Sequence, residues 1–156
     1  MNGPLPQAEF DAIYARVPRL TVEVILRDGR GVFLTRRASG PCAGLWHLPG
    51  GTVRFAEPLE EAVIRVTLAE TGITVTGARQ AGAIEYPSHY LKGLDHPVGV
   101  AFEAAWHGEP EASEGADADG WFSELPVIMH DEQRSFLERY PAALALLPVG
   151  VRGARA

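Results

Sequence analysis

The spacing of apolar residues near the start of the chain predicts a helix followed by a β-hairpin. In residues 6–17, apolar side chains recur at the i, i+3, i+4 and i+7 positions of one helical face, which predicts an amphipathic helix. From residue 20 to residue 27, apolar residues at even positions alternate with mostly polar residues at odd positions. Asp28 and Gly29 then supply a hairpin turn, so a strand is expected on each side of them.

The rest of the chain predicts one long helix, two strands and a last helix. Pro58 suits the first turn of a helix, and Gly72 suits its C-terminal cap. Residues 73–84 and 98–106 have strand character, whereas the segments 86–95 and 107–120 are expected to be loops. Residues 131–140 form an amphipathic pattern that ends before Pro141. Strands mixed with a few helices predict one α+β domain spanning residues 1–156.

Composition narrows the class of protein. The chain has 156 residues, 46% hydrophobic and 22% charged, which is typical of one globular domain with its own core. The lone cysteine, Cys42, excludes an internal disulfide and indicates a reducing compartment. Residues 1–20 lack a signal-peptide core, and no apolar run is long enough to span a membrane, so we expect a cytoplasmic protein without a membrane partner.

The charge distribution argues against a nucleic acid polymer as partner. The net charge is −6, whereas nucleic acid binding needs a basic surface. Arginines are concentrated between residues 27 and 65, and acidic residues between 103 and 132. This separation suits a small anionic ligand bound with a divalent cation, although solvated surface charge explains it equally well.

The stretch "GGTVRFAEPLEEAVIRVTLAETG", residues 50–72, carries the strongest chemical signal. A pair of glycines lets a ligand approach the backbone closely. Glu61 and Arg65 have the i, i+4 spacing of a helical ion pair. Glu70 shares a helical face with Val66 and two other buried-type residues, so its side chain is expected to point inward. An inward carboxylate needs a partner, and a metal ion is one candidate.

This stretch resembles the Nudix box, a Gly-x5-Glu-x7-Arg-Glu-U-x-Glu-Glu-x-Gly-U pattern in which U is a bulky apolar residue. Residues 51–73 match it in register at Gly51, Glu57, Arg65, Glu70 and Gly72, followed by Ile73. The resemblance implies an α/β/α sandwich with a mixed sheet, and hydrolysis of a nucleoside diphosphate linked to another moiety. It also implies Mg²⁺ as cofactor, with Mn²⁺ as a possible substitute.

The box departs from the usual pattern at Val66, Thr67 and Ala69. The altered segment "RVTLAETG" is similar to that of the GDP-mannose mannosyl hydrolases, Nudix relatives that use a single Mg²⁺ and attack the sugar carbon. Arg37 matches an arginine of that group, and Glu23 stands where the group has an aspartate. The group's general-base histidine falls on Ala116 here, so another substrate than GDP-mannose is expected. The resemblance further implies a homodimer.

The resemblance assigns roles to seven residues. Catalysis is assigned to Glu57, Arg65 and Glu70. Metal binding is assigned to Glu70 with the backbone of Gly50 or Gly51, and substrate binding to Arg37 and Glu23. A structural ion pair with Glu57 or Glu61 is an equally good explanation of Arg65. The general base stays open among six residues, Glu111, Glu114, Asp117, Asp119, His89 and His96. The alternative function is a nucleotide- or sugar-binding module that has lost hydrolysis. Attack at phosphorus and attack at the sugar carbon both remain open.

Overall fold

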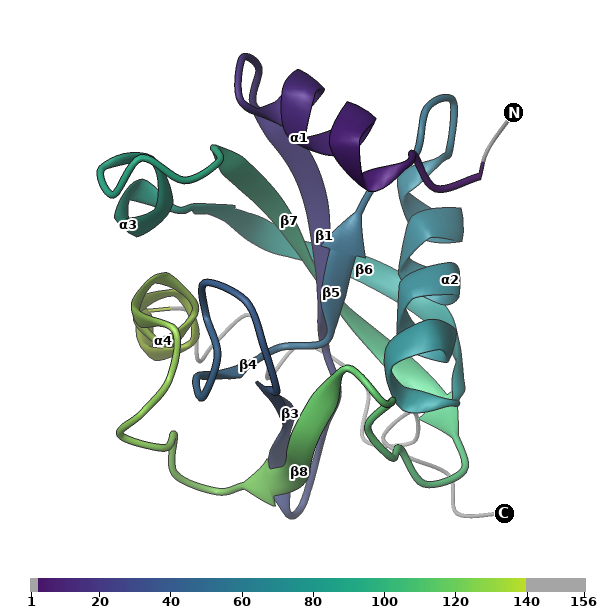
Figure 1. Ribbon diagram of the computed structural model, residues 1–156. Helices are drawn as coiled ribbons and strands as arrows, with labels where there is room; N and C mark the ends of the chain where they lie inside the picture. The colour runs from purple at the N-terminus through teal and green to yellow at the C-terminus, as the bar shows by residue number, and fades with distance from the viewer. Residues whose placement is uncertain (1–2, 140–156) are drawn as a thin grey trace.

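The structure is built around β1 (Arg19–Ile25), a strand that pairs along both of its edges (Figure 1). The computed structural model describes residues 3–139. β1 pairs antiparallel with β5 (Gly50–Thr52) on one edge and parallel with β7 (Pro97–His107) on the other. β6 (Thr74–Glu85) pairs antiparallel with β7, giving the order β5-β1-β7-β6. The predicted α+β class with a mixed sheet is confirmed.

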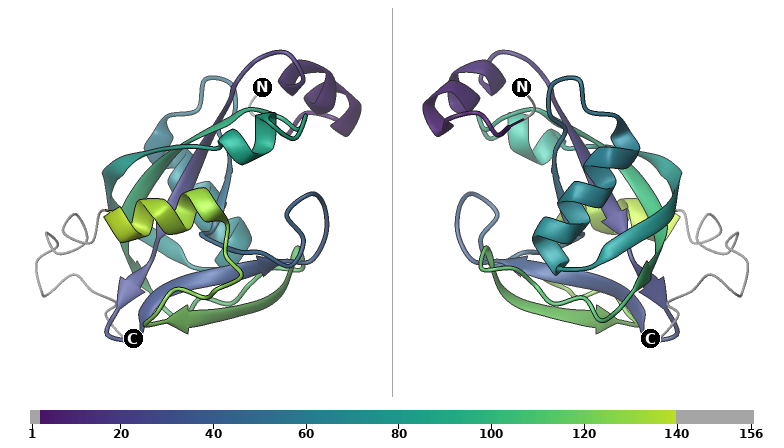
Figure 2. Two further views of the ribbon diagram at one scale, coloured as in Figure 1. Left: turned by 90° about the vertical axis from the view of Figure 1, so that its left-hand side faces the viewer. Right: turned by 90° about the vertical axis from the view of Figure 1, so that its right-hand side faces the viewer.

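A second, smaller sheet forms around β3 (Gly31–Arg37). β2 (Arg27–Asp28) and β4 (Trp46–His47) pair with opposite ends of β3, and β8 (Ala116–Phe122) pairs with it along its length. The loop between β3 and β4 extends from this sheet towards the side on which the N-terminal helix lies (Figure 2).

Helices cover both faces of the first sheet. The long helix α2 (Leu59–Thr71) lies on one face, and the shorter helices α3 (Pro87–Tyr90) and α4 (Asp131–Arg139) lie on the other (Figure 1). The helices are α1 (Gln7–Tyr14), α2 (Leu59–Thr71), α3 (Pro87–Tyr90) and α4 (Asp131–Arg139). None of the helices in residues 3–139 combines the length and apolar character that crossing a membrane requires.

Successive residues of β1 face two different cores. Val22 and Val24 pack in a core with Val63 and Val66 of α2, whereas Ile25 belongs to a second core with Phe136 of α4. All residues from Thr21 to Ile25 are buried, because β1 is an internal strand covered on both faces. Glu23 therefore lies inside the protein, on the face of β1 opposite α2.

The long helix agrees with the sequence prediction at its C-terminal end. Gly72 adopts a left-handed conformation (φ 72°), and its amide donates to the Leu68 carbonyl at 2.9 Å. Glycine has no Cβ that opposes this conformation, which is why it ends helices so often. The last helix also forms where predicted, except that Tyr140 lies outside the described residues.

The predicted loop over residues 107–120 is wrong in its last part. Residues 116–120 belong to β8, which pairs with β3 from Val32↔Phe122 to Arg37↔Ala116. The segment "ADADG" has little intrinsic strand preference, and the pairing with β3 overrides this weak tendency. An ion pair between Arg36 and Asp117 (2.7 Å) adds a contact between the two strands.

Three smaller predictions also need correction. The N-terminal helix ends at Tyr14 instead of Val17, since Pro18 disfavours helical geometry in the residue before it. The hairpin turn lies one residue later than expected, because Asp28 pairs with Gly31. The segment 86–95 contains the single-turn helix α3.

The hairpin offers a matched pair of glycines for a stability test. A Cβ at Gly31 (φ 115°) would overlap the carbonyl of Phe122, whereas a Cβ at Gly29 meets nothing within 4 Å. We expect Gly31→Ala to lower the free energy of unfolding by ~2–4 kcal/mol through overlap and backbone strain. Gly29→Ala should change it by less than about 0.5 kcal/mol. Urea denaturation of both variants measures this difference, and equal stabilities would contradict the described packing of β3 against β8.

Candidate active site

A pocket of about 660 Å³ lies on the face of the first sheet opposite α2. Its walls come from α1, β1, β5, the loop after β3, α3 and the start of α4. Five of the lining residues are important here, which are Glu23, Arg37, Gly50, Gly51 and His89. The pocket therefore brings together the glycines of the box and both residues predicted to bind substrate.

Glu23 lies in the wall of this pocket, held between backbone segments. It pairs with Gly50 of β5, and a Cβ at Gly50 would overlap its carboxylate. The Thr21 hydroxyl donates to Glu23 Oε1 at 2.9 Å, and the amide of Gln133 approaches Oε2 at 3.5 Å. Burial raises the pKa of Glu23 to about 7. This carboxyl group therefore titrates near neutral pH, at a position where Gly50 has no side chain to displace it.

Arg37 enters the pocket from the end of β3. The register between β3 and β8 shifts between Arg36 and Arg37, leaving Asp117 without an opposite residue. Such a bulge changes the direction of the following side chain. Arg36 is bound to Asp117, whereas Arg37 lines the pocket and its charge acts on the Glu70 carboxyl.

Glu70 is half-buried on α2, one turn after Val66. A Cβ at Gly51 would lie 3.0 Å from Val66, so this side of α2 faces β5. Burial raises the pKa of Glu70, and the nearby charge of Arg37 partly opposes the rise. Within residues 3–139, neither a hydrogen bond nor an ion pair reaches its carboxylate. A half-buried carboxylate without a bonded partner fits a hard cation such as Mg²⁺.

Two positions that are acidic in the usual box are occupied here by Val66 and Ala69, so Glu70 is the one carboxylate left in this part of the box. Val66 is 3% exposed and belongs to the core between α2 and the first sheet. Ala69 is exposed on the outer side of α2. Residues that are acidic in the usual box therefore provide apolar packing or surface here.

Arg65 and Glu57 form an ion pair that holds the segment before α2. Arg65 donates to Glu57 at 2.6 and 2.8 Å and to the Thr52 carbonyl at 2.9 Å. Glu57 also accepts the backbone amide of Arg54 at 2.8 Å. Neither residue lines the pocket. The geometry supports the structural explanation of Arg65, and a direct part in catalysis stays a prediction for both residues.

The expected i, i+4 pair between Glu61 and Arg65 is absent from the described residues. The guanidinium of Arg65 points back along the helix to Glu57, whose side chain is only 7% exposed, and Glu61 is exposed. A buried carboxylate with a second donor from Arg54 is the better partner, since charge-assisted bonds are stronger away from water.

Of the six candidate bases, only His89 lines the pocket. Asp117 is bound to Arg36, and Asp119 accepts the amide of Ala112 at 2.7 Å. Glu111 and Glu114 lie on the β7–β8 connection, and His96 packs edge-on against Tyr90. A position in the pocket thus separates His89 from the other five.

Two further pocket residues, Cys42 and His130, were not predicted as site residues. Their side chains lie beside His89, although the three residues are far apart in the sequence. Single cysteines and histidines without a regular spacing give no metal-binding or catalytic motif, so only the folded structure reveals the group.

Comparison with known proteins places these features in context. A family model described as NUDIX domain matches residues 17–140. The chain is 33% identical over 146 residues to the low-salt glycan biosynthesis protein Agl8 of Haloferax volcanii, covering 90% of each chain. It is 28% identical over 120 residues to the ADP-ribose pyrophosphatase of Methanocaldococcus jannaschii, covering 75% of this chain and 70% of that protein. The crystal structure of a MutT NUDIX hydrolase from Burkholderia pseudomallei gives a TM-score of 0.73 at 32% identity, covering 79% of this chain and 98% of its own.

The Glu57–Arg65 pair generates a pH-dependent prediction. Arg65 holds the pKa of Glu57 below its ordinary value of 4.5, so the folded state binds fewer protons than the unfolded state as pH falls below that value. The pair's stabilisation is therefore complete above pH 4.5 and is lost as pH falls through the folded-state pKa. We expect Glu57→Gln to cost ~1–3 kcal/mol at pH 7 and progressively less in acid.

Glu61→Gln is the matched control, because Glu61 is an exposed residue in the first turn of the same helix. Denaturant titrations between pH 3 and pH 7 compare the two variants with the parent chain. A Glu57→Gln deficit that stays constant down to pH 3 would contradict an ion pair as its cause.

Proposed function

The chain belongs to the NUDIX domain family, and from this premise we propose that it is a Mg²⁺-dependent hydrolase of a nucleoside diphosphate joined to a sugar or a related group. One observation carries the proposal most strongly. The glycines of the box, Arg37 and Glu23 line one pocket. Glu70 is not among the lining residues, but its carboxylate has no bonded partner within residues 3–139 and is affected by the charge of Arg37.

The pocket suits a ligand of this class in size and chemistry. Its volume of about 660 Å³ lies within the usual range of small-molecule sites. Phe10, Tyr14 and Tyr86 supply aromatic surface for a base or a sugar ring. The guanidinium of Arg37 can bind phosphate oxygens, and guanidinium groups suit them better than ammonium groups. The Glu23 carboxyl, with its pKa near 7, can accept or donate a hydrogen bond to a sugar hydroxyl.

Glu70 and a backbone carbonyl of Gly50 or Gly51 are the protein ligands that we assign to the cation. Magnesium commonly takes one or two carboxylates, with waters and substrate phosphates in the remaining positions, so a single carboxylate is sufficient. When bound, the cation neutralises charge on the departing diphosphate. Glu57 and Arg65 hold the segment between β5 and α2, and through it the positions of the two glycines.

The relatives favour a sugar as the second moiety. One is described as a glycan biosynthesis protein and another as an ADP-ribose pyrophosphatase. ADP-ribose is itself a nucleoside diphosphate joined to a sugar. A substrate of the same general form fits a pocket that combines aromatic rings, an arginine and an acidic group.

Turnover of a defined substrate panel tests this proposal. We expect Mg²⁺-dependent hydrolysis of at least one nucleotide sugar or ADP-ribose. We expect no release of nucleotides from DNA or RNA. Reaction in H₂¹⁸O distinguishes the two possible positions of attack, because label enters the phosphate after attack at phosphorus and the sugar after attack at carbon. Ligand-induced stabilisation without any product, with either Mg²⁺ or Mn²⁺, would instead support a binding module without hydrolytic activity.

Substitution of the metal ligand gives a second prediction. We expect Glu70→Gln to lower kcat/KM at least ~100-fold, because the substitution removes the only carboxylate that we assign to the cation. Its melting temperature without metal should match that of the parent chain, since the carboxylate has no bonded partner among the described residues. Glu60→Gln, an exposed change in the same helix, should keep full activity. A large loss of stability in Glu70→Gln would show that Glu70 is structural.

A further inference from the structure

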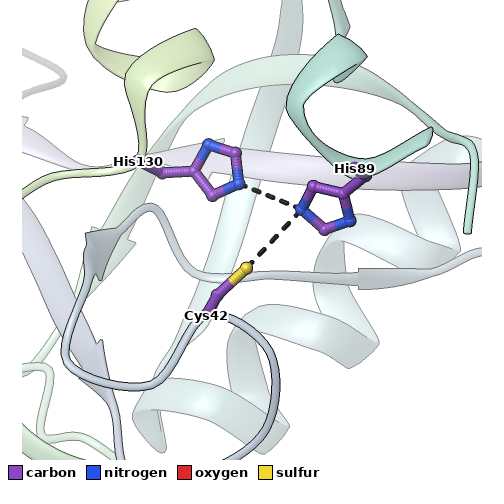
Figure 3. A group of neighbouring side chains, drawn as sticks. All are labelled: Cys42, His89 and His130. Atoms are coloured by element: carbon purple, nitrogen blue, oxygen red, sulfur yellow. Dashed lines mark hydrogen bonds between the residues drawn. The ribbon is translucent and has the colours of Figure 1, made fainter. Parts of the chain in front are cut away.

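Cys42, His89 and His130 form a compact cluster in the pocket wall (Figure 3). Cys42 comes from the loop between β3 and β4, His89 from α3, and His130 immediately precedes α4. Cys42 Sγ lies 3.5 Å from His89 Nε2, and His89 Nε2 lies 3.1 Å from His130 Nε2. One donor atom from each residue lies within 4.8 Å of the others.

The other nitrogen of each histidine faces a carboxylate. His89 Nδ1 lies 2.9 Å from Asp95 Oδ1, and His130 Nδ1 lies 3.1 Å from Glu132 Oε2. An ionised carboxylate can only accept, so the hydrogen bond with Asp95 favours a proton on His89 Nδ1. The contact between His130 and Glu132 has the distance of an ion pair but not the geometry of a hydrogen bond. The Nε2 atoms of the two rings face each other, and His89 Nε2 also faces the thiol. A transition-metal cation can take one donor atom from each of these three side chains.

The carboxylates are themselves held in place. Asp95 accepts a hydrogen bond from Arg19 at 2.6 Å. Glu132 accepts the backbone amide of Ser88, the neighbour of His89, at 2.8 Å. Carboxylates that orient metal-bound histidines through their second nitrogen are a regular feature of zinc sites. The His89 imidazole is therefore oriented in this way by Asp95, and the Glu132 carboxylate lies beside the His130 imidazole.

From this arrangement we propose that Cys42, His89 and His130 bind a transition-metal ion, with Zn²⁺ as the preferred metal. Zinc–nitrogen bonds of about 2.05 Å and zinc–sulfur bonds of about 2.3 Å in a tetrahedron separate two nitrogens by about 3.3 Å and nitrogen from sulfur by about 3.6 Å. The observed separations are 3.1 and 3.5 Å. Two of the three donor separations thus already match those of zinc ligands, and the third, between Cys42 and His130, is within 4.8 Å.

The chemistry of the donors separates this site from the magnesium site at Glu70. Thiolate and imidazole are ligands for zinc and similar metals, whereas Mg²⁺ prefers oxygen. Three protein ligands leave a fourth position of the tetrahedron, and all three residues line the pocket, so a water or a ligand oxygen can occupy it.

Cys42, His89 and Asp95 also have the order of a thiol, a base and an orienting carboxylate. His130 argues against a nucleophilic triad. His130 Nε2 lies 3.1 Å from His89 Nε2, whereas the Cys42 thiol lies 3.5 Å from it. His130 therefore contacts the same nitrogen that would have to act as the base for Cys42. The metal site accounts for all three side chains and for the carboxylate bonded to His89. It rests on these contacts alone and does not depend on the proposed hydrolysis.

Metal uptake by the full chain, purified without a polyhistidine tag and stripped with chelator, tests the zinc site. We expect one equivalent of Zn²⁺ per chain by calorimetry and elemental analysis. Co²⁺ should bind with the thiolate-to-metal absorption band and the intense visible bands of a tetrahedral complex. Cys42→Ser should remove the thiolate band, and His89→Gln and His130→Gln should each weaken zinc binding at least ~100-fold. His107→Gln, an exposed histidine at the end of β7, should bind like the parent chain.

Circular dichroism and thermal melts establish that each variant is folded. Asp95→Asn should weaken zinc binding by ~10–100-fold, because it removes the carboxylate that orients His89. The proposal is overturned if the parent chain takes up no zinc, or if binding is equally strong in Cys42→Ser and His130→Gln. Rapid alkylation of Cys42 at the same rate with and without Zn²⁺ would also overturn it and favour a free nucleophile. Because these assays contain no nucleotide, their failure leaves the hydrolysis proposal unaffected.

Discussion

The close approach of β1 and β5 at Glu23 and Gly50 is the constraint on which the pocket depends. The Glu23 carboxylate occupies the space that a Cβ at Gly50 would need, so this register requires a glycine. Gly51 has a similar relation to Val66 of α2. Backbone without side chains thus separates a buried carboxyl group on one side from the helix of the box on the other. The site combines a closely packed strand pair with an exposed ligand-sized hollow.

Electrostatics divide the acidic residues of this region by their partners. Glu57 has Arg65 and a backbone amide, and its pKa is lowered. Glu23 has neutral hydrogen-bond donors, and burial raises its pKa to about 7. Glu70 has the charge of Arg37 nearby but no bonded partner in residues 3–139. The first arrangement stabilises structure, whereas the other two leave carboxyl groups whose charge a ligand or cation can change.

Local signals in the sequence predicted the elements that depend on them. Gly72 ends α2 because glycine tolerates its left-handed conformation, and the spacing of Val63, Val66 and Glu70 determines which side of the helix turns inward. β8 was missed because its pairing partner lies some eighty residues earlier and its own composition has little strand preference. The cluster of Cys42, His89 and His130 was missed for the same reason, since it exists only after three distant segments meet. The sequence did not determine whether Arg65 pairs with Glu57 or with Glu61. The observed contact with Glu57 depends on the turn before α2, which residue spacing alone does not predict.

The position of a divalent cation relative to Glu70 tests the central claim most directly. Crystals grown with Mn²⁺ and a non-hydrolysable nucleotide sugar, measured at the manganese absorption edge, locate the ion without reference to activity. The account predicts an anomalous peak bonded to the Glu70 carboxylate and to a carbonyl of Gly50 or Gly51, with the diphosphate against Arg37. A direct ion pair between Glu70 and Arg37, with no manganese beside them and the nucleotide bound elsewhere, would contradict it.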